Sequence, residues 1–345
     1  MVVSTLGAGS PQPQTLPSPL TTLLDPISRE LTHVEEVLAE QVAGFDPRVS
    51  HYVDYVLSGT GKRLRPTLAL LSGGATEKIT DGHIKLGVIV ELIHIATLVH
   101  DDILDGADIR HRLPTANTRW GNEISVLLGD CLFAHALSLA ASYPTTEVCR
   151  RVSEATNTVC AGEILQTQYR FNLDLSLDDY LNVIDMKTGA LFAVSCELGG
   201  SLNSSTPATV ESLRMFGSNL GIAYQIYDDC VDILGQERKA GKSLGTDVKK
   251  GKLTLPFLLL LQGTAPAKRS ALGEMIFRDE PEDRQQLKAL ITNNGAMNKS
   301  LLMIDSYVAR AEANLAAIPV NTYSKTLFGL LHYLSAQSRQ LLRAA

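Results

Sequence analysis

The sequence predicts an all-α protein, built as one large helical bundle. Beyond Leu20, almost every segment places its apolar residues at the 3.6-residue spacing of an amphipathic helix. No segment shows a convincing strand-like alternation, and the apolar run 253–261 is rich in helix-forming leucine instead of β-branched residues. No linker-like composition interrupts residues 21–345. We therefore expect a single domain with a central active-site cavity between facing helices.

The expected helices follow one another through short connections. Turn residues mark several of these connections, such as Gly59-Thr60-Gly61 and Asn293-Asn294-Gly295. Residues 1–20 are rich in Pro, Ser, Thr and Gly and contain no Lys or Arg, so we expect a disordered tail and not a targeting peptide. The expected helical ranges are 21–42, 46–57, 64–76, 82–105, 122–142, 146–171, 177–200, 207–234, 253–262, 267–278, 283–294, 298–317 and 322–343.

Composition excludes several classes of protein. The formal net charge is −6 and the pI is about 5.8, which argues against a nucleic-acid partner. The five cysteines are odd in number and form no C-x-x-C pair, so a disulfide framework is not expected. These features favour a reducing, cytoplasmic location. The longest apolar run, 84–99, contains Lys85, Glu91 and His94 and is too short to span a bilayer.

One acidic pattern occurs twice, as Asp101-Asp102-Ile103-Leu104-Asp105 and as Asp228-Asp229-Cys230-Val231-Asp232. In a helix, positions i and i+4 share a face and i+1 lies beside it, so each copy presents three carboxylates at one helix end. Clustered carboxylates repel one another, and their hard oxygen ligands suit Mg²⁺ together with a substrate phosphate. Two such clusters suggest a cage for metal ions and a diphosphate.

A single cluster of this kind also has a simpler interpretation as a solvated helix end, because acidic helix faces are common. The recurrence of the pattern argues against that interpretation. So does the segment 86–99 before the first copy, in which Glu91 is the one charged residue. A helix that is apolar on most sides is usually buried.

Basic residues gather at three places near these motifs. Residues 61–66, Gly-Lys-Arg-Leu-Arg-Pro, put three cations at a loop-to-helix junction, where phosphates commonly bind. The simpler interpretation is a basic surface turn. Further cations follow each aspartate motif, and those beyond the second lie among glycines, as in a loop that closes over a phosphate. They are Arg110, His111 and Arg112 after the first motif, and Lys242, Lys249, Lys250 and Lys252 after the second.

Together, these blocks resemble the signature of trans-isoprenyl diphosphate synthases, the polyprenyl synthetase family. The other matching blocks are residues 187–192, Lys-Thr-Gly-Ala-Leu-Phe, and residues 245–247 with 251–256. All occur in the family's order at near-family spacing, and the resemblance is strong over about residues 50–262. It implies the isoprenoid synthase type of helical bundle, most like the medium- and long-chain polyprenyl diphosphate synthases.

The resemblance implies a homodimer that condenses isopentenyl diphosphate head to tail with an allylic prenyl diphosphate. Three Mg²⁺ ions on the allylic diphosphate would be held by Asp101, Asp102, Asp105, Asp228, Asp229 and Asp232. The same diphosphate would contact Arg110, Lys187 and Lys242. The isopentenyl diphosphate site would include Gly61, Lys62, Arg65 and His94. Thr188 and Gln225 match residues beside the reacting carbons, and Lys252 matches a lysine of a closing loop.

One position departs from the family pattern, which has two adjacent arginines and then glycine after the first motif. Here His111 follows Arg110, and Arg112 stands where glycine is usual. Arg112 reaching the same phosphate from a shifted position is an open alternative. Because a lone histidine is mostly neutral at pH 7, we expect weaker or pH-sensitive binding of isopentenyl diphosphate. An unchanged KM for this substrate in His111→Arg would contradict that expectation.

Product length is expected to depend on how far the growing tail descends between the helices. Ala96 and Thr97 lie about one turn below Asp101, and both are small. Short-chain members of the family often carry an aromatic residue here, so the resemblance implies a product longer than C20 that associates loosely with membranes. The alternative is that both residues merely pack against a neighbouring helix, with the floor formed by a residue such as Phe133 or Leu137.

Other interpretations remain open from the sequence. A short-chain synthase making C15 or C20 products would use the same motifs. A terpene cyclase of the same fold has no second diphosphate to bind, so the basic residues 61–65 argue against it. A regulatory subunit of a heteromeric prenyl synthase would not need both aspartate motifs, although His111 keeps that alternative open.

Overall fold

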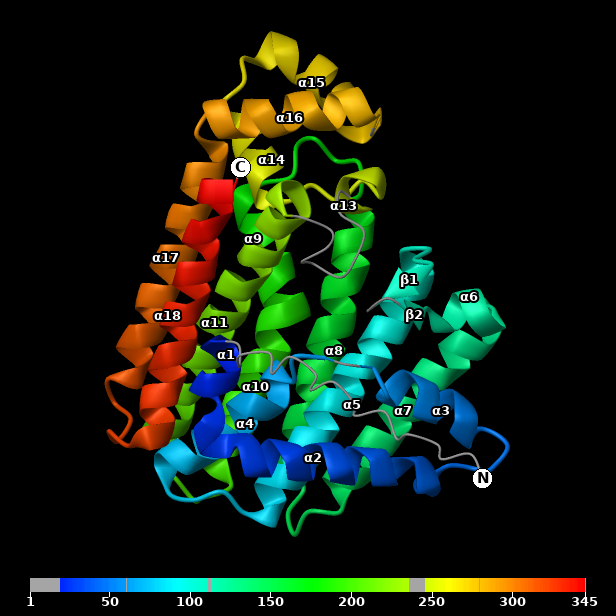
Figure 1. The fold of residues 1–345 in the computed structure, drawn as a ribbon, viewed down its shortest axis with the longest axis vertical. Helices are drawn as coiled ribbons and strands as arrows, with labels where there is room; N and C mark the ends of the chain where they lie inside the picture. Colours follow the sequence, from blue (N-terminus) through cyan, green and yellow to red (C-terminus); the bar gives the residue numbers. More distant parts are fainter. Residues whose placement is uncertain (1–18, 60, 111–112, 236–245, 279, 345) are drawn as a thin grey trace, which may run out of the picture.

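The computed structural model describes residues 19–59, 61–110, 113–235, 246–278 and 280–344. It confirms the all-α fold: long helices run side by side along the molecule, and α2 crosses one end of the bundle (Figure 1). The first helices are α1 (Pro19–Leu23), η1 (Asp25–Ile27), α2 (Ser28–Glu40), η2 (Gln41–Gly44), α3 (Ser50–Leu57), α4 (Leu64–Thr76), α5 (Asp81–Leu104), α6 (Ala116–Trp120), α7 (Asn122–Ala141) and α8 (Glu147–Gln168). The later helices are α9 (Leu177–Ile184), η3 (Asp185–Gly189), α10 (Ala190–Ser201), α11 (Pro207–Leu234), α13 (Thr246–Lys249), α14 (Leu255–Gln262), α15 (Pro266–Arg278), α16 (Pro281–Asn293), α17 (Ala296–Leu315) and α18 (Thr322–Ala344).

The helix boundaries expected from the sequence agree with the structure where a capping residue is present. The helix expected over 207–234 is α11, and the Thr206 side chain accepts a hydrogen bond from the Thr209 amide at 3.2 Å.

Three expectations need correction. The helix expected over 21–42 is broken around Pro26, which has no backbone N–H to continue it. The helix expected over 177–200 contains the π-helical turn η3. The expected tail already forms α1 at residues 19 and 20, and residues 1–18 lie outside the described residues.

A short β-hairpin was also not expected. Strands β1 (Ile109–Arg110) and β2 (Leu113–Pro114) pair antiparallel, with Ile109 opposite Pro114 and Arg110 opposite Leu113. Two residues per strand are too few to show any alternation in the sequence. The hairpin follows directly after the first aspartate motif, and it carries Arg110 back toward Asp102.

The core of the bundle is organised around α5, α10 and α11. Helix α5 is buried along most of its length and packs against α4 and α7, while α10 packs against α4 and α11. Glycines allow the closest of these approaches. A Cβ on Gly217 would lie 2.5 Å from the Phe192 carbonyl oxygen, and one on Gly221 would lie 2.8 Å from the Gly189 Cα. The backbone of α11 therefore lies directly against η3 and α10.

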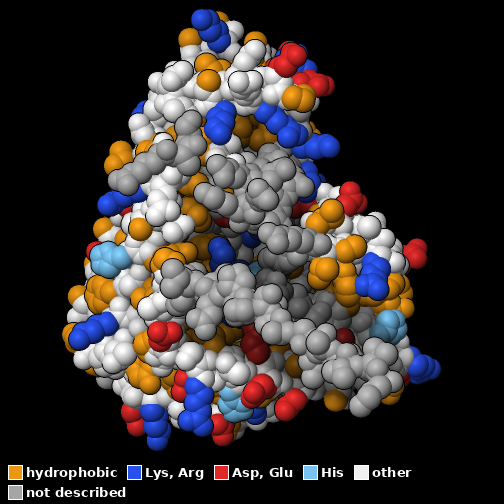
Figure 2. Space-filling view, in the orientation of Figure 1, with side chains coloured by type: hydrophobic (Ala, Val, Ile, Leu, Met, Phe, Trp, Pro, Cys, Tyr) orange, Lys and Arg blue, Asp and Glu red, His pale blue; other side chains and the backbone are white. Residues whose placement is uncertain are grey.

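Both aspartate motifs lie at the same end of the bundle, toward α13 (Figure 1). Lys and Arg side chains gather near α13 on the face shown in Figure 2. By length and composition alone, α5 and α7 are apolar enough to cross a membrane. The most apolar window of α5 is 72% buried within the bundle, as expected of a core helix, whereas that of α7 is only 33% buried.

Candidate active site

The aspartates occupy the C-terminal ends of two helices. Asp101 and Asp102 lie in the last turn of α5, and Asp105 caps it. The second motif lies in the last two turns of α11, where Asp229 and Asp232 are buried. Neither helix has a basic residue in its last turn. A helix C-terminus carries partial negative charge, so carboxylates there are unfavourable unless a cation compensates them.

Cations from other elements surround the first motif. The Arg110 guanidinium lies 2.8 Å from the Asp102 carboxylate, and the Lys187 amine lies 3.6 Å from Asp101. Asp105 contacts three further cations, from two different parts of the chain. They are Lys252 at 2.9 Å, Arg170 at 3.3 Å and Lys250 at 3.7 Å. The motif thus collects positive charge from β1, η3, the end of α8 and the segment after α13.

These contacts favour the charged forms of Asp105 and Lys187, whereas burial still raises the pKa of Asp102 above its ordinary value. Burial acts to raise the pKa of Asp105, but Lys252, Lys250 and Lys187 outweigh it and hold that pKa below its ordinary value. Burial likewise acts to lower the pKa of Lys187, but Asp101 and Glu163 outweigh it and raise that pKa. Lys187 also forms an ion pair with Glu163 and donates to the Gln166 side chain at 3.1 Å.

The second motif is held by neutral hydrogen-bond donors. The buried Tyr180 hydroxyl donates to one oxygen of Asp229 at 2.6 Å, and the Gln225 amide donates to the other at 2.9 Å. The Thr188 hydroxyl donates to the Gln225 carbonyl at 2.7 Å. Burial, with Asp247 and Asp228 nearby, raises the pKa of Asp229 to about 8. Burial is the main cause of this shift and the neighbouring carboxylates add to it, so the neutral form of Asp229 is favoured unless a cation lies nearby.

The turn η3 links the two motifs. Lys187 contacts Asp101, and the adjacent Thr188 connects through Gln225 to Asp229. Among the described residues, no group of three or more His, Cys, Asp or Glu side chains is close enough to hold one ion. The donor set nevertheless suits divalent cations, because these carboxylates lie at helix C-termini and no cation of the described residues pairs with Asp229.

The basic segment 61–65 enters α4 beside α10 and α11. The Lys62 amine lies 5.9 Å from the centre of the Tyr224 ring, and the Arg65 guanidinium lies 5.1 Å from that of Phe192. Burial lowers the pKa of Arg65 to about 10, and its Nε has no hydrogen-bond partner among the described residues. His94 is half-buried on α5, one turn beyond Glu91. These residues offer positive charge beside the bundle interior.

The structure distinguishes the two small residues below the first motif. Ala96 is fully buried, and Thr97 is half-buried, with its hydroxyl donating to the His94 carbonyl at 2.6 Å. The Phe133 ring on α7 lies 5.7 Å from the His100 ring. Of the two positions, only Thr97 is partly exposed.

Several contacts were not anticipated from the sequence. Tyr180 and Arg170 had no motif to identify them, because their partners lie far away along the chain. The sequence does indicate a partner for Glu91, because a lone carboxylate in an apolar helix needs a buried cation. Three predicted residues, His111, Arg112 and Lys242, lie outside the described residues.

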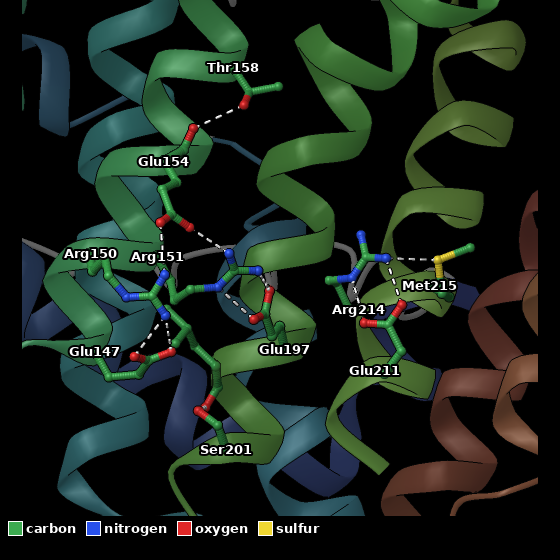
Figure 3. Close-up of polar contacts among 11 residues, drawn as sticks. Glu147, Arg150, Arg151, Glu154, Thr158, Glu197, Ser201, Glu211, Arg214 and Met215 are labelled. Atoms are coloured by element: carbon green, nitrogen blue, oxygen red, sulfur yellow. Dashed lines mark hydrogen bonds and ion pairs between the residues drawn. The ribbon is translucent and has the colours of Figure 1, made fainter. Parts of the chain in front are cut away.

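A separate charged cluster joins α8 to α10, and a further ion pair lies within α11 (Figure 3). Arg151 makes a bidentate pair with Glu197, with N–O distances of 2.6 and 2.7 Å, and Arg214 pairs with Glu211. Arg151 lies about three helical turns before Glu163 on α8. Each of these guanidinium groups already has a carboxylate partner, so the cluster fastens helices together and offers no free charge to a phosphate.

Comparisons with known proteins agree with this geometry. A family model described as polyprenyl synthetase matches residues 46–294. The chain is 32% identical over 309 residues to the all-trans-nonaprenyl-diphosphate synthase (geranyl-diphosphate specific) of Rhodobacter capsulatus, covering 89% of this chain and 95% of that one. It is 30% identical over 316 residues to the octaprenyl diphosphate synthase of Escherichia coli, covering 88% and 97%. A crystal structure of a polyprenyl synthase from Caulobacter crescentus, complexed with calcium and isoprenyl diphosphate, matches with a TM-score of 0.87 at 31% identity, covering 93% and 98%.

Proposed function

The chain belongs to the polyprenyl synthetase family and is a prenyltransferase, and we propose that it makes an all-trans polyprenyl diphosphate longer than C20. The reaction would join isopentenyl diphosphate head to tail, through a 1′-4 bond, to an allylic prenyl diphosphate. One observation supports this most directly. Two aspartate motifs lie at one end of the bundle, joined through Lys187, Thr188 and Gln225, and a separate basic segment at 61–65 can hold a second diphosphate.

We propose that the six motif aspartates hold Mg²⁺, three ions per site as in the family. When bound, the ions supply positive charge to the diphosphate that departs from the allylic substrate. The related Caulobacter crescentus enzyme was crystallised with calcium and isoprenyl diphosphate, which supports a divalent ion beside a prenyl diphosphate. The aspartates proposed to bind the ions are Asp101, Asp102, Asp105, Asp228, Asp229 and Asp232.

The chain's own cations would act on the same leaving group. Arg110 and Lys187 lie against the first motif, so both can stabilise the negative charge that develops as the carbon–oxygen bond breaks. Lys252 contacts Asp105. It can bind the same diphosphate if the segment after α13 closes over the substrate. Lys242 is proposed for the same diphosphate from the family pattern, and its position lies outside the described residues.

The second substrate would attack the allylic cation from the side of the basic segment. We assign its diphosphate to Gly61, Lys62, Arg65 and His94. The hydroxyl of Thr188 and the amide of Gln225 present oxygen atoms that stabilise positive carbon without capturing it. The departing diphosphate can accept the proton that leaves after the new bond forms. The apolar interior excludes water, which would otherwise trap the cation.

The relatives support a long product. Proteins named for C45 and C40 chains, nonaprenyl and octaprenyl, match nearly the whole chain. The small Thr97 below the first motif is consistent with a tail that descends past this point. Such a product is a lipid, so we propose a cytoplasmic enzyme that associates loosely with membranes through its product.

The test is to incubate the pure protein with Mg²⁺, an allylic diphosphate and labelled isopentenyl diphosphate, and then to size the products. Labelled linear chains beyond C20 are expected. Labelled chains that stop at C15 or C20 would identify a short-chain synthase. An unlabelled cyclic hydrocarbon would identify a cyclase, and turnover only after a partner is added would identify a regulatory subunit.

We also propose a homodimer formed through α7 and α8. Helix α7 is strongly apolar yet largely exposed, with Val126 43% and Leu127 60% exposed, and Ile164 on α8 is 60% exposed. Apolar area of this kind is typically covered by a partner. Light scattering should give a dimer mass for the wild type and a monomer mass for Leu127→Glu. The matched control is Leu302→Glu, because Leu302 is equally exposed at 68% but lies on α17.

A further inference from the structure

Arg63 lies inside the basic segment 61–65, but its side chain is already occupied by protein groups. Its Nε and Nη2 donate to the two oxygens of Glu35 at 2.5 and 3.0 Å, and its Nη1 donates to Glu91 at 2.8 Å. Nη2 also donates to the Gly59 carbonyl at 3.1 Å. Four of the five donors of a guanidinium are thereby used. Arg63 has little capacity left for an incoming phosphate, unlike its neighbours Lys62 and Arg65.

The backbone at Arg63 is left-handed, with φ 49° and ψ 38°. This conformation is unfavourable for a residue with a Cβ, and it persists only where surrounding contacts hold it. The residue stands directly before α4, so its turn sets the direction in which the chain leaves Lys62 and enters the helix. The side-chain contacts of Arg63 are therefore well placed to fix the conformation of the whole basic segment.

Glu91 connects this contact to Arg65. Its carboxylate is 2% exposed on α5, and it lies against the segment, because a Cβ on Gly61 would be 3.7 Å from its Oε1. Burial lowers the pKa of Arg65, and the charge of Glu91 acts in the opposite direction. One buried carboxylate thus forms an ion pair with Arg63 and also favours the charged form of Arg65.

Packing on the outer side of the segment is incomplete. A cleft of about 350 Å³ opens between α2, α3 and the segment, lined by Glu35, Leu57, Gly59, Gly61 and Arg63 among others. Gly61 and Arg63 line this cleft, so the segment is accessible from it. The ion pairs of Arg63 are then a principal tether between the segment and the two helices α2 and α5.

We propose that Glu35, Arg63 and Glu91 form a clasp that positions Lys62 and Arg65 for the second diphosphate. Arg63 is a positioning residue that sets the affinity for isopentenyl diphosphate and leaves the allylic site unaffected. This inference rests on the proposed function. Selectivity for the second substrate is expected because Glu35 and Glu91 contact the basic segment through Arg63, whereas the allylic diphosphate is assigned to the aspartate motifs at the C-terminal ends of α5 and α11.

The test compares KM for each substrate in the wild type, Arg63→Gln, Glu35→Gln and the double variant. Each single variant should raise the KM for isopentenyl diphosphate about tenfold, and the double variant should be no worse than Arg63→Gln, because paired residues are not additive. The KM for the allylic diphosphate should stay within about twofold, since the charge network at that site is separate. Arg63→Lys should recover only part of the affinity, because an amine cannot bridge two carboxylates as a planar fork does.

Arg48→Gln is the matched control, because Arg48 forms an exposed ion pair with Asp46 at 2.8 Å. It should change neither KM. Equal increases in both KM values, or no increase in either, would overturn the clasp. If Arg63→Gln does not fold, Glu35→Gln decides the question, because Glu35 is 47% exposed. Calorimetry measures the binding of isopentenyl diphosphate directly and does not depend on product formation. Equal affinities of the wild type and Glu35→Gln would overturn the clasp, whereas a failure to make chains would overturn the proposed function.

Discussion

At the residue scale, the aspartates depend on side chains that no motif contains. Tyr180 belongs to α9, yet its hydroxyl fixes one oxygen of Asp229, while Gln225 fixes the other. Groups that orient a ligand in this way typically matter almost as much as the ligand itself. The hydrogen bond from Tyr180 already restricts the rotation of the Asp229 carboxylate. Asp229 therefore loses less conformational entropy when it binds a cation.

We expect Tyr180→Phe to raise the Mg²⁺ concentration for half-maximal activity roughly tenfold. The ring stays in place, so only the hydrogen bond at 2.6 Å is lost. Tyr143→Phe is the control, because that half-buried tyrosine donates its hydroxyl to the Gly82 carbonyl near the start of α5, distant from both motifs. The same Mg²⁺ dependence in wild type and Tyr180→Phe would contradict a role in orienting Asp229.

His83 illustrates how a single buried side chain makes stability depend on pH. Its Nδ1 lies 3.1 Å from the Thr80 amide, and its Nε2 lies 2.9 Å from the Gly199 carbonyl. Burial lowers the pKa of His83 below its ordinary value of 6.5. The folded state therefore binds fewer protons than the unfolded state as the pH falls through 6.5.

It follows that the contribution of His83 to stability is fully present above about pH 6.5 and is lost as the pH falls from that value. Urea unfolding at pH 7.5 and pH 5.5 should show a smaller drop in the free energy of unfolding for His83→Gln than for the wild type. His33→Gln, at an exposed position, should keep the wild-type drop. His83→Ala should be destabilised by roughly 1–3 kcal/mol at pH 7.5, because it leaves buried groups without partners.

At the scale of elements, the close contact between α11 and η3 holds Thr188 against Gln225. A Cβ on Gly221 would meet the Gly189 Cα at 2.8 Å and the Phe192 Cβ at 3.2 Å. We expect Gly221→Ala to separate the two elements, costing roughly 1–3 kcal/mol in the free energy of unfolding, as overpacked cores do. The kcat should fall as well, because the Thr188–Gln225 contact opens.

Gly82→Ala is the matched substitution, since a Cβ there would have only ordinary contacts, the nearest at 3.4 Å. It should leave kcat unchanged and be neutral or slightly stabilising, as is usual for glycine in a helix. Thermal unfolding and steady-state kinetics check both variants. A Gly221→Ala enzyme with wild-type kcat would show that this contact is not needed for turnover.

The same elements show what the sequence can and cannot specify. Helix α11 was predicted with its correct ends because Thr206 and Pro207 are local signals. The turn η3 packs against α8 and α11. It was missed because no local pattern in the sequence indicates a π-helical turn. The aspartate motifs were predicted from spacing, since carboxylates at i and i+4 share a helix face. Their partners Arg170 and Tyr180 were not, because those contacts depend on how distant segments fold together.

At the scale of the whole molecule, product length depends on the space inside the bundle below the first motif. Ala96 is fully buried, so a large side chain there would disrupt the packing of the core. Such a variant would test stability and not product length. Thr97 is half-buried, and its hydroxyl bonds only to the backbone of its own helix among the described residues. It is therefore the position at which a larger side chain can block the tail and still leave the fold intact.

We expect Thr97→Phe to shorten the longest product by at least one isoprene unit, since an aromatic ring would form a floor about one helical turn below Asp101. The KM for the allylic diphosphate should change little, because that diphosphate is assigned to the aspartate motifs above this point. Thr97→Val removes the hydroxyl at nearly constant volume, and it should give the wild-type product distribution. Chromatographic sizing of the dephosphorylated products measures the effect. An unchanged distribution in Thr97→Phe would mean that the tail follows another route through the bundle, with its floor at a residue such as Phe133 or Leu137.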